Sequence, residues 1–490
     1  MTTALTTRGV IRGTTGAGCT AFLGVPYAAA PVGDLRWAPP APAAPWEGVL
    51  DTTAYGPAAW QPTGGPLDGL VPGMGSSDQG DDCLSLNVWT PAADDQRRPV
   101  MVWIHGGAYS LGAGSLGVYD GTRLAAATDT VVVTINYRLG ALGFMVLDDP
   151  SASANVGLLD QVAALEWVRD NIAALGGDPE RVTIFGESAG AGCVLSLLAM
   201  PLASGLFHRA IAQSGATDLL LDPPKAREVT EVFARCAGVD PDDIDAMRAL
   251  SPEVVLAAQA QAAGELFATV GTMPFHPCVD GEVLPHSWLE ASEKGVNAVP
   301  LVMGTTRDEM GLFISFDPAA ATLDEAGLRG RLAAAAPDLD ADLVLDAYAQ
   351  TGTTEPPDVW GRINTDQAMW LPAVRIAAAR ASHAPLWMYR FDWPAVDARM
   401  GAPHAIDVPF PFTNIDIDGW DSFVADPDAA AGLARTEQAL WASFARDGVP
   451  SAEGVEWPQF DADRRATLVL GRTVEVADDP NGPVRRVWGA

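Results

Sequence analysis

The chain has 490 residues, of which 48% are hydrophobic and 19% are charged. This composition supports a large buried core and excludes a disordered protein. The 62 acidic residues outnumber the 30 basic ones, giving a net charge of −32, and Lys225 and Lys294 are the only lysines. Because phosphate groups are bound by clustered Lys and Arg, this balance argues against nucleic acid or an anionic membrane as a partner.

The cysteine content and the hydropathy predict the compartment. The five cysteines cannot all pair, and none stand in a Cys-x-x-Cys spacing, which favours free thiols in a reducing environment. The first residues lack the apolar core of a signal peptide, and no stretch approaches the ~20 apolar residues of a membrane span. We therefore expect a cytoplasmic protein without a membrane span, acting as a monomer or small homo-oligomer.

The pattern of apolar residues predicts the elements in chain order. Pro- and Gly-rich stretches at 39–45 and 64–75 are expected to be surface loops. From Pro99 onward, continuous apolar runs, typical of strands covered on both faces, alternate with stretches of helical periodicity. The expected strands are 100–104, 131–135, 182–185, 301–303 and 386–391, and the expected helices are 158–172 and 191–199.

This alternation predicts an α/β fold with a central, mostly parallel sheet and helices on both of its faces. The Ala- and Leu-rich stretch 322–381 is expected to hold helices inserted over one end of the sheet. No repeat or long low-complexity linker divides the chain. We therefore expect residues 1–490 to form a single domain.

A Gly-x-Ser-x-Gly motif, Gly186-Glu187-Ser188-Ala189-Gly190, lies between an expected strand and an expected helix. A serine at such a turn adopts strained dihedrals to project its hydroxyl, and the residues two positions away must be small to avoid collision. The following helix points its positive end at the serine and favours developing negative charge. Ser188 is therefore the candidate nucleophile.

The serine needs a base, and the base needs an acid that orients it. In this kind of fold the order along the chain is serine, acid, histidine. His404 follows the expected strand 386–391 whereas His383 precedes it, so His404 is the better candidate base for a site at the carboxyl edge of the sheet. Asp308 and Glu309 both come just after an earlier expected strand, and the residues alone do not choose between them.

The attack of such a serine creates an oxyanion that needs preorganised backbone N–H donors. One donor should be the residue after the nucleophile, Ala189. The others should come from His105-Gly106-Gly107-Ala108, which directly follows the expected strand 100–104, because small residues let the backbone approach the substrate. His105 precedes the glycines and is expected to shape the loop rather than act as a base.

With these motifs in view, the chain resembles the type-B carboxylesterases, the branch of the α/β-hydrolase fold that includes bacterial para-nitrobenzyl esterases, liver carboxylesterases and cholinesterases. The matching segments run nearly from end to end. Besides the Ser188 turn they are FLGVPYA (22–28), DDCLSLNV (81–88), VWIHGGA (102–108), NYRLG (136–140), NVGLLDQ (155–161) and QSG (213–215).

The resemblance implies the α/β-hydrolase fold and the hydrolysis of carboxylic esters through an acyl-enzyme. It implies that Ser188 is the nucleophile, His404 the base, and Glu309 rather than Asp308 the acid. The motifs imply no metal or organic cofactor, and the expected partner is a small-molecule ester.

The resemblance also implies the residues that support this triad. Oxyanion donors carry over to Gly107, Ala108 and Ala189, with Gly106 shaping the turn. A polar network behind the triad would be formed by Glu187 and Ser214.

Other positions carry over as pocket or framework residues. Leu312 and Phe313 fall where the family often lines its acyl pocket. The family's structural ion pairs would be formed by Arg36 with Asp81 and by Arg138 with Asp160.

The chain departs from the family pattern at three positions. Cys83 matches a cysteine of the family's early disulfide, but its partner position near Ala58 and Ala59 carries no cysteine, so we expect no bridge. Ala108 stands where many eukaryotic members have Gly, which narrows the pocket by one methyl group. Met310 replaces the glycine that often follows the acid.

Other functions have partial support in the sequence. Some relatives of this fold lack the serine and act only in binding, but Ser188, Glu309 and His404 are all present here. The segment 414–419 resembles the start of a calcium loop, but Ala425 occupies its twelfth position. His404 and Asp407 have a spacing that suits zinc, without further ligands nearby. Hydrolysis of amides, thioesters or carbamates by the same triad stays an open alternative.

Overall fold

The structure is a computed structural model that describes residues 1–64, 71–74, 77–217, 219–271, 273–314 and 317–490. Within these residues one sheet has the order β1-β2-β3-β5-β7-β6-β8-β9-β10-β11-β12-β13, and β4 pairs with β2. The strands are β1 (Thr2–Leu5), β2 (Val10–Gly16), β3 (Cys19–Pro26), β4 (Val49–Asp51), β5 (Ser85–Thr90), β6 (Arg98–Ile104), β7 (Val131–Ile135), β8 (Gly177–Glu187), β9 (Arg209–Gln213), β10 (Leu301–Thr306), β11 (Leu386–Phe391), β12 (Ala466–Leu470) and β13 (Val474–Asp478).

The centre of the sheet, from β7 to β12, is parallel, and the outer pairings are mostly antiparallel. Each of the five expected strands lies within an observed strand. In the parallel part, Ile104 pairs with Gly186 and Glu187 with Gln213. The chain segments that follow these strands therefore emerge at the same edge of the sheet, which is where α/β folds carry their sites.

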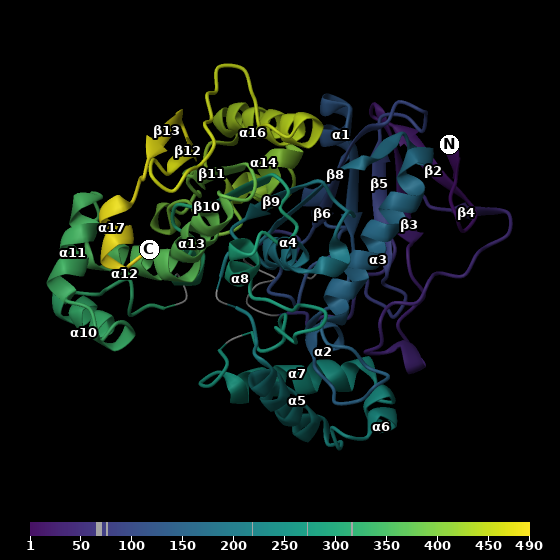
Figure 1. Ribbon diagram of the computed structural model, residues 1–490, viewed down its shortest axis with the longest axis horizontal. Helices are drawn as coiled ribbons and strands as arrows, with labels where there is room; N and C mark the ends of the chain where they lie inside the picture. The colour runs from purple at the N-terminus through teal and green to yellow at the C-terminus, as the bar shows by residue number, and fades with distance from the viewer. Residues whose placement is uncertain (65–70, 75–76, 218, 272, 315–316) are drawn as a thin grey trace.

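Helices cover both faces of the sheet (Figure 1). They are α1 (Thr122–Thr128), α2 (Gly140–Phe144), α3 (Val156–Asn171), α4 (Ala189–Ala199), α5 (Pro223–Ala237), α6 (Ile244–Arg248), α7 (Pro252–Leu266), α8 (Trp288–Glu293), α9 (Gly311–Ile314), α10 (Glu325–Ala335), α11 (Ala341–Gln350), α12 (Pro356–Thr365), α13 (Leu371–Arg380), α14 (Pro409–Phe412), α15 (Trp420–Phe423), α16 (Pro427–Asp447) and α17 (Gly482–Val487).

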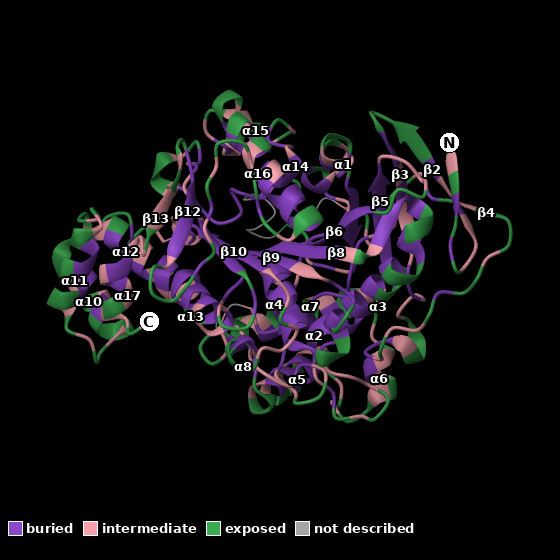
Figure 2. Cartoon of the chain, turned by 45° about the horizontal axis from the view of Figure 1, so that its top comes forward, coloured by how far each residue is buried: buried purple, intermediate pink, exposed green. Residues whose placement is uncertain are grey.

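Two hydrophobic cores form because side chains alternate across the strands. In β6, Val100 and Val102 belong to the core that includes α3 and α4. Met101 and Trp103 point to the opposite core, which is built with α14 and α16. Figure 2 shows the consequence: the central strands are buried, while exposed residues lie on the outer surfaces of the helices.

The stretch 322–381 contains α10, α11 and α12, a π-helical turn (Asp366–Trp370), and α13. Figure 1 places α10, α11 and α12 with α17 at one end of the molecule, beyond β12 and β13. Of the two expected loops, 39–45 is free of helix and strand except for a bridge at Pro42. Most of 64–75 lies outside the described residues, at 65–70 and 75.

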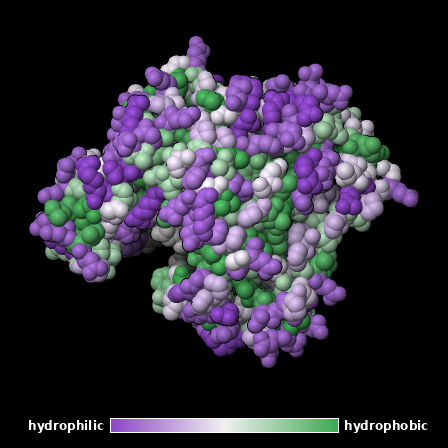
Figure 3. Space-filling view, in the orientation of Figure 1, coloured by the Kyte–Doolittle hydropathy of each residue, from purple (hydrophilic) through white to green (hydrophobic). Residues whose placement is uncertain are grey.

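The surface is mainly hydrophilic on the face shown in Figure 3, with a recess between the segment that contains α10–α12 and the segment that contains α5–α7. Within the described part of the chain, no helix combines the length and the apolar character needed to span a membrane.

Candidate active site

The candidate nucleophile lies in a strained turn between β8 and α4. Ser188 has φ 56° and ψ −126°, a combination that residues other than glycine rarely adopt. A Cβ atom at Gly190 would lie 2.0 Å from the carbonyl oxygen of Ile104, so only glycine allows this turn to pack against β6. The turn has the geometry that the sequence predicts for residues 186–190.

Three side chains form a continuous chain of hydrogen bonds at the carboxyl edge of the sheet. The Ser188 hydroxyl lies 2.8 Å from Nε2 of His404, and Nδ1 of His404 lies 2.7 Å from Oε2 of Glu309. The other oxygen of Glu309 accepts a 2.7 Å hydrogen bond from the backbone N–H of Thr306. Glu309 is completely buried and His404 nearly so. The imidazole is therefore held between a hydroxyl and a fixed carboxylate.

The rejected candidates lie elsewhere. His383 contacts the carbonyl of Glu293 through Nε2 and is exposed. His105 is buried, its Nδ1 donates to the carbonyl of Gly106, and its ring stacks on Tyr137. Burial lowers the pKa of His105 to about 4, so this imidazole stays neutral and serves the loop, as expected.

The glycine-rich loop after β6 lies directly against the Ser188 turn. A Cβ atom at Gly106 would lie 3.1 Å from that of Ser188, so the two backbones pack without a side chain between them. Within the described residues, the backbone N–H groups of Gly107, Ala108 and Ala189 donate to no other protein group. These donors are available to an oxyanion next to Ser188.

Further carboxylates surround His404. Oε1 of Glu187 lies 3.2 Å from Nε2 of His404. Burial opposes the charged imidazole, but Glu187, Glu309 and Asp407 outweigh it and raise the pKa of His404. Burial also raises the pKa of Glu187 and of Asp407. Burial thus disfavours the charged form of each of these groups, while the imidazolium and the ionised Glu187 and Asp407 carboxylates favour one another.

Buried polar groups also lie around the expected network residues Glu187 and Ser214. Within the described residues, the Ser214 hydroxyl has no hydrogen-bond partner, so no direct contact joins it to Glu187, and their shared network stays a prediction. Asp407, also buried, accepts hydrogen bonds from Gln213 (3.0 Å) and Tyr389 (3.2 Å). Sequence reasoning missed this role of Asp407, although its position three residues after His404 was a usable signal.

A second missed residue is Glu437 in α16. Its side chain is completely buried, and neither carboxylate oxygen has a hydrogen-bond partner in the described part of the chain. Burial, reinforced by nearby Asp407, raises the pKa of Glu437 well above its usual range. The signal in the sequence is a charged residue at an apolar position of an amphipathic helix, between Leu433 and Leu440.

The two expected pocket residues lie in α9, and one of the two expected framework ion pairs is present among the described residues. The Phe313 ring lies 5.5 Å from the His404 ring, centroid to centroid, whereas Leu312 is buried. Arg138 and Asp160 form the expected buried ion pair at 2.7 Å. The pairing of Arg36 with Asp81 is wrong: Arg36 donates to the carbonyls of Arg248 and Leu250, and Asp81 accepts from Trp60.

The cysteines and the segment that resembles a calcium loop form no disulfide or metal site among the described residues. Cys83 is buried and forms no disulfide, and the other four cysteines are also free, with Cys236 only half-buried. Asp416, in the segment that resembles a calcium loop, forms an ion pair with Arg123. In the ranges that the structure describes, no three His, Cys, Asp or Glu side chains are grouped so that they could hold a metal ion.

A sheet of this topology, with a serine, a histidine and a carboxylate in hydrogen-bond contact at its carboxyl edge, defines a serine hydrolase of the α/β-hydrolase fold. A sequence profile described as the carboxylesterase family matches residues 2–488. The chain belongs to the carboxylesterase family and is a serine-type hydrolase of carboxylic esters.

Individual relatives agree with this placement over nearly their whole length. The para-nitrobenzyl esterase of Bacillus subtilis is 39% identical over 483 residues, covering 98% of this chain and 96% of the relative. The phenmedipham hydrolase of Pseudarthrobacter oxydans is 38% identical, covering 97% of this chain and 96% of the relative. The crystal structure of a Geobacillus stearothermophilus carboxylesterase superposes with a TM-score of 0.87 at 38% identity, covering 100% of both chains. The expected fold class and family are thus confirmed.

Proposed function

We propose that Ser188, His404 and Glu309 act as the nucleophile, base and orienting acid of this carboxylesterase. The observation that carries the proposal is the hydrogen-bond chain from Ser188 Oγ through the imidazole to Glu309, at 2.8 Å and 2.7 Å. His404 takes the proton as the hydroxyl attacks the ester carbonyl. Glu309 keeps the imidazole in the tautomer that accepts at Nε2 and stabilises the cation that forms.

The oxyanion of the tetrahedral intermediate would be held by the N–H groups of Gly107, Ala108 and Ala189, with Gly106 keeping the loop against the nucleophile. Support comes from the close packing of Gly106 on Ser188 and from the position of Ala189 in the first turn of α4, where N–H groups have no partner within the helix. The alcohol then leaves with the proton from His404, and water releases the acyl group by the reverse proton transfers.

For the substrate we propose a small-molecule carboxylic ester whose bound part contacts Phe313, with Leu312 behind it. The ring of Phe313 against His404 supports this side of the pocket. We further propose a single domain over 1–490 with the helices of 322–381 as an insertion, working in the cytoplasm as a monomer or small homo-oligomer. All proposed groups come from one chain, and the five free thiols suit a reducing compartment.

The proposal is tested by S188A, with S422A, at an exposed position of α15, as the matched control. We expect S188A to lower kcat on an aryl ester by roughly 10⁴–10⁶ without changing the circular dichroism spectrum. A fluorophosphonate should label Ser188 and leave S188A unlabelled, while S422A behaves like the parent. Retention of activity by S188A, or a label on another residue, would contradict the assignment. Parallel assays on matched amide, thioester and carbamate substrates measure the preference for esters.

A further inference from the structure

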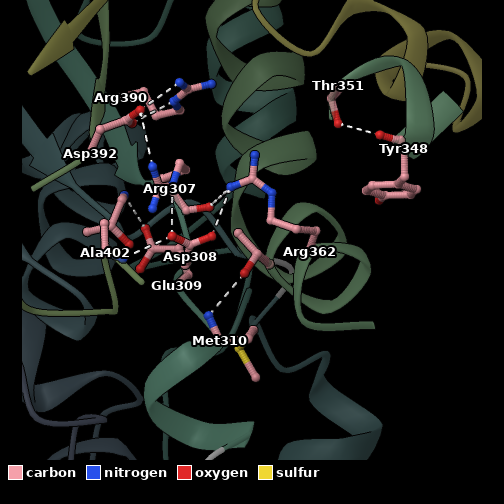
Figure 4. A network of polar contacts seen from close by, with 12 residues as sticks. Arg307, Asp308, Glu309, Met310, Tyr348, Thr351, Arg362, Arg390, Asp392 and Ala402 are labelled. Atoms are coloured by element: carbon pink, nitrogen blue, oxygen red, sulfur yellow. Dashed lines mark hydrogen bonds and ion pairs between the residues drawn. The ribbon is translucent and has the colours of Figure 1, made fainter. Parts of the chain in front are cut away.

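Asp308, the carboxylate beside the proposed acid, is held by three donors. Its Oδ2 atom accepts from Nε of Arg307 at 2.8 Å and from the backbone N–H of Ala402 at 2.9 Å. Its Oδ1 atom accepts from Nη1 of Arg362 at 3.1 Å. Figure 4 shows these contacts converging on Asp308 from three different segments. Asp308 is therefore a junction between segments.

Two of these segments are the loops that carry Glu309 and His404. The backbone N–H of Asp308 donates to the carbonyl of Ala402 at 2.9 Å, and the N–H of His404 donates to the carbonyl of Glu309 at 3.3 Å. The bond from Ala402 N–H to the Asp308 side chain adds a third link between the loops. The distance between the Glu309 carboxylate and the imidazole is thus set by a short ladder in which Asp308 supplies two of the three contacts.

The third segment is α12, which lies outside the sheet. The Arg362 guanidinium donates to the carbonyl of Arg307 as well as to Asp308, and its side chain is 12% exposed. Three residues on, Thr365 accepts a 3.0 Å hydrogen bond from the backbone N–H of Met310. Helix α12 therefore holds the Glu309 loop on both sides of Glu309 (Figure 4).

We propose that Asp308 and Arg362 are positioning residues that clamp the Glu309 loop to the His404 loop, so that α12 sets the geometry of the acid and base. The inference rests on the proposed triad and deepens it. Its physical reason is that charge-assisted hydrogen bonds are strong and directional, while a displacement of about 1 Å between reacting groups can cost about 10²-fold in rate. Other charged groups nearby are Asp392, 3.9 Å from Arg307, Arg390, which is paired with Asp392, and Asp366, buried near Arg362.

The test compares D308A, D308N, R362M and R362K with the parent. D308A removes the acceptor of both Ala402 and Arg362, and we expect it to lower kcat about 10–100-fold with KM changed less than about 3-fold. D308N keeps an oxygen for Ala402 and should recover part of that loss. R362M should lower kcat less than D308A does, and R362K should show a smaller loss of kcat than R362M. Because the two side chains share one contact, while Arg362 also donates to the Arg307 carbonyl, the loss of kcat in D308A/R362M should be smaller than the two single losses combined.

The pH profile of kcat/KM separates positioning from general destabilisation. A looser contact between Glu309 and His404 lowers the pKa of the imidazole, so the acidic limb should move to lower pH in D308A and R362M. The matched control is R329M, which breaks an exposed pair with Asp342 in the same helical segment and should leave kcat and the limb unchanged. The proposal is overturned if D308A and R362M keep the parental kcat and the parental acidic limb of the pH profile. It is also overturned if the losses of kcat in D308A and R362M are fully additive in the double variant.

Two measurements keep this test distinct from that of the proposed function. If the triad assignment is wrong, the parent is not labelled by a fluorophosphonate at Ser188 and S188A stays active. If only the clamp is wrong, labelling and the loss in S188A are as expected, but the Asp308 and Arg362 variants match the parent. Should D308A fail to fold, the comparison of D308N and R362K with the parent decides by the same two readouts, kcat and the position of the limb.

Discussion

At His404, acid groups meet the imidazole from two sides. Glu309 contacts Nδ1 at 2.7 Å, and Glu187 lies 3.2 Å from Nε2, next to the Ser188 hydroxyl. Burial disfavours the imidazolium, but the negative groups dominate and raise the pKa of His404 above the usual value of 6.5. A base of this kind is neutral, and able to accept the serine proton, only at higher pH.

The pH dependence of kcat/KM should therefore have its acidic limb above pH 6.5. E187Q removes the carboxylate near Nε2, and because an opposite charge at this distance raises the pKa of an imidazole by about 1–3 units, the limb should move to lower pH by about one unit. Stopped assays on a neutral ester between pH 5 and 10, with the fold checked by circular dichroism, measure both profiles. A parental limb at or below 6.5, or the same limb in E187Q, would contradict the electrostatic account.

Residues with a local motif could be predicted, and residues defined by tertiary contacts could not. Ser188 is fixed by a five-residue pattern whose glycines are required by backbone packing. Glu309 was indistinguishable from Asp308 from the residues alone, because both follow β10 and only side-chain direction separates them. The structure turns Glu309 toward His404 and Asp308 toward Arg362, a difference that depends on a helix more than fifty residues away in the chain.

At the scale of the element, α16 contains an unusual core position. Its apolar face includes Leu433, Leu440, Trp441 and Phe444, and Glu437 lies on that face, completely buried. Burying an ionised carboxylate without a partner is very costly, so such a group stays protonated in the folded protein. Burial and the nearby Asp407 therefore favour the protonated form of Glu437 in the folded protein.

This element predicts a pH-dependent stability. Above about pH 4.5 the unfolded chain releases the Glu437 proton, whereas the folded chain retains it. Stability contributed by this proton is complete below the unfolded pKa and declines as the pH rises toward the folded pKa. E437Q mimics the neutral acid, so its stability relative to the parent should increase between pH 5 and 8 by up to about 1.4 kcal/mol per pH unit.

Thermal melts of E437Q and the parent at several pH values test this, with E231Q on the exposed face of α5 as the control. The difference in melting temperature should grow with pH for E437Q and stay constant for E231Q. A difference for E437Q that is constant or shrinks as the pH rises would show that Glu437 is ionised in the folded protein.

The elements themselves were predictable to different degrees. The central strands β6 and β7 are buried along their whole length, so continuous apolar runs identify them. The outer strands β1 and β2 mix buried and exposed residues, and β13 has only half-buried and exposed ones, so their short patterns do not stand out from loops. The two predicted helices, 158–172 and 191–199, end close to where the structure ends them. The 3-10 turn that continues α3 ends at Gly176, and α4 ends just before Pro201, two residue types that commonly terminate helices.

At the scale of the whole molecule, the order of strands could not be predicted although their parallel arrangement could. Strand β6 lies between β7 and β8, and β5 lies between β3 and β7. Such pairings join segments far apart in the chain, and an apolar run does not say which neighbour it will have. The apolar periodicity did not give the strand order, but the resemblance to the carboxylesterases implied the α/β-hydrolase fold. The family profile confirms that resemblance over residues 2–488.

The net charge of −32 also acts on the molecule as a whole. Most ion pairs on the surface are exposed, and each such pair stabilises by only about 0–1 kcal/mol. The excess of acidic side chains repels itself in the folded state. Because the Debye length falls from about 30 Å at 0.01 M to about 10 Å at 0.1 M ionic strength, salt screens this long-range repulsion more than it weakens close contacts.

Stability should consequently rise with sodium chloride. With an unfolding entropy near 2.1 cal/mol/K per residue, each kcal/mol of screened repulsion raises Tm by about 1 °C for a chain of 490 residues. We expect Tm at pH 7.5 to increase steadily from 10 to 500 mM sodium chloride, and to increase less at pH 5, where the net charge is smaller. Chloride is chosen over sulfate because sulfate strengthens apolar burial regardless of charge. A Tm that falls with salt at pH 7.5 would mean that the ion pairs outweigh the repulsion, and the acidic surface would then be stabilising through its local contacts.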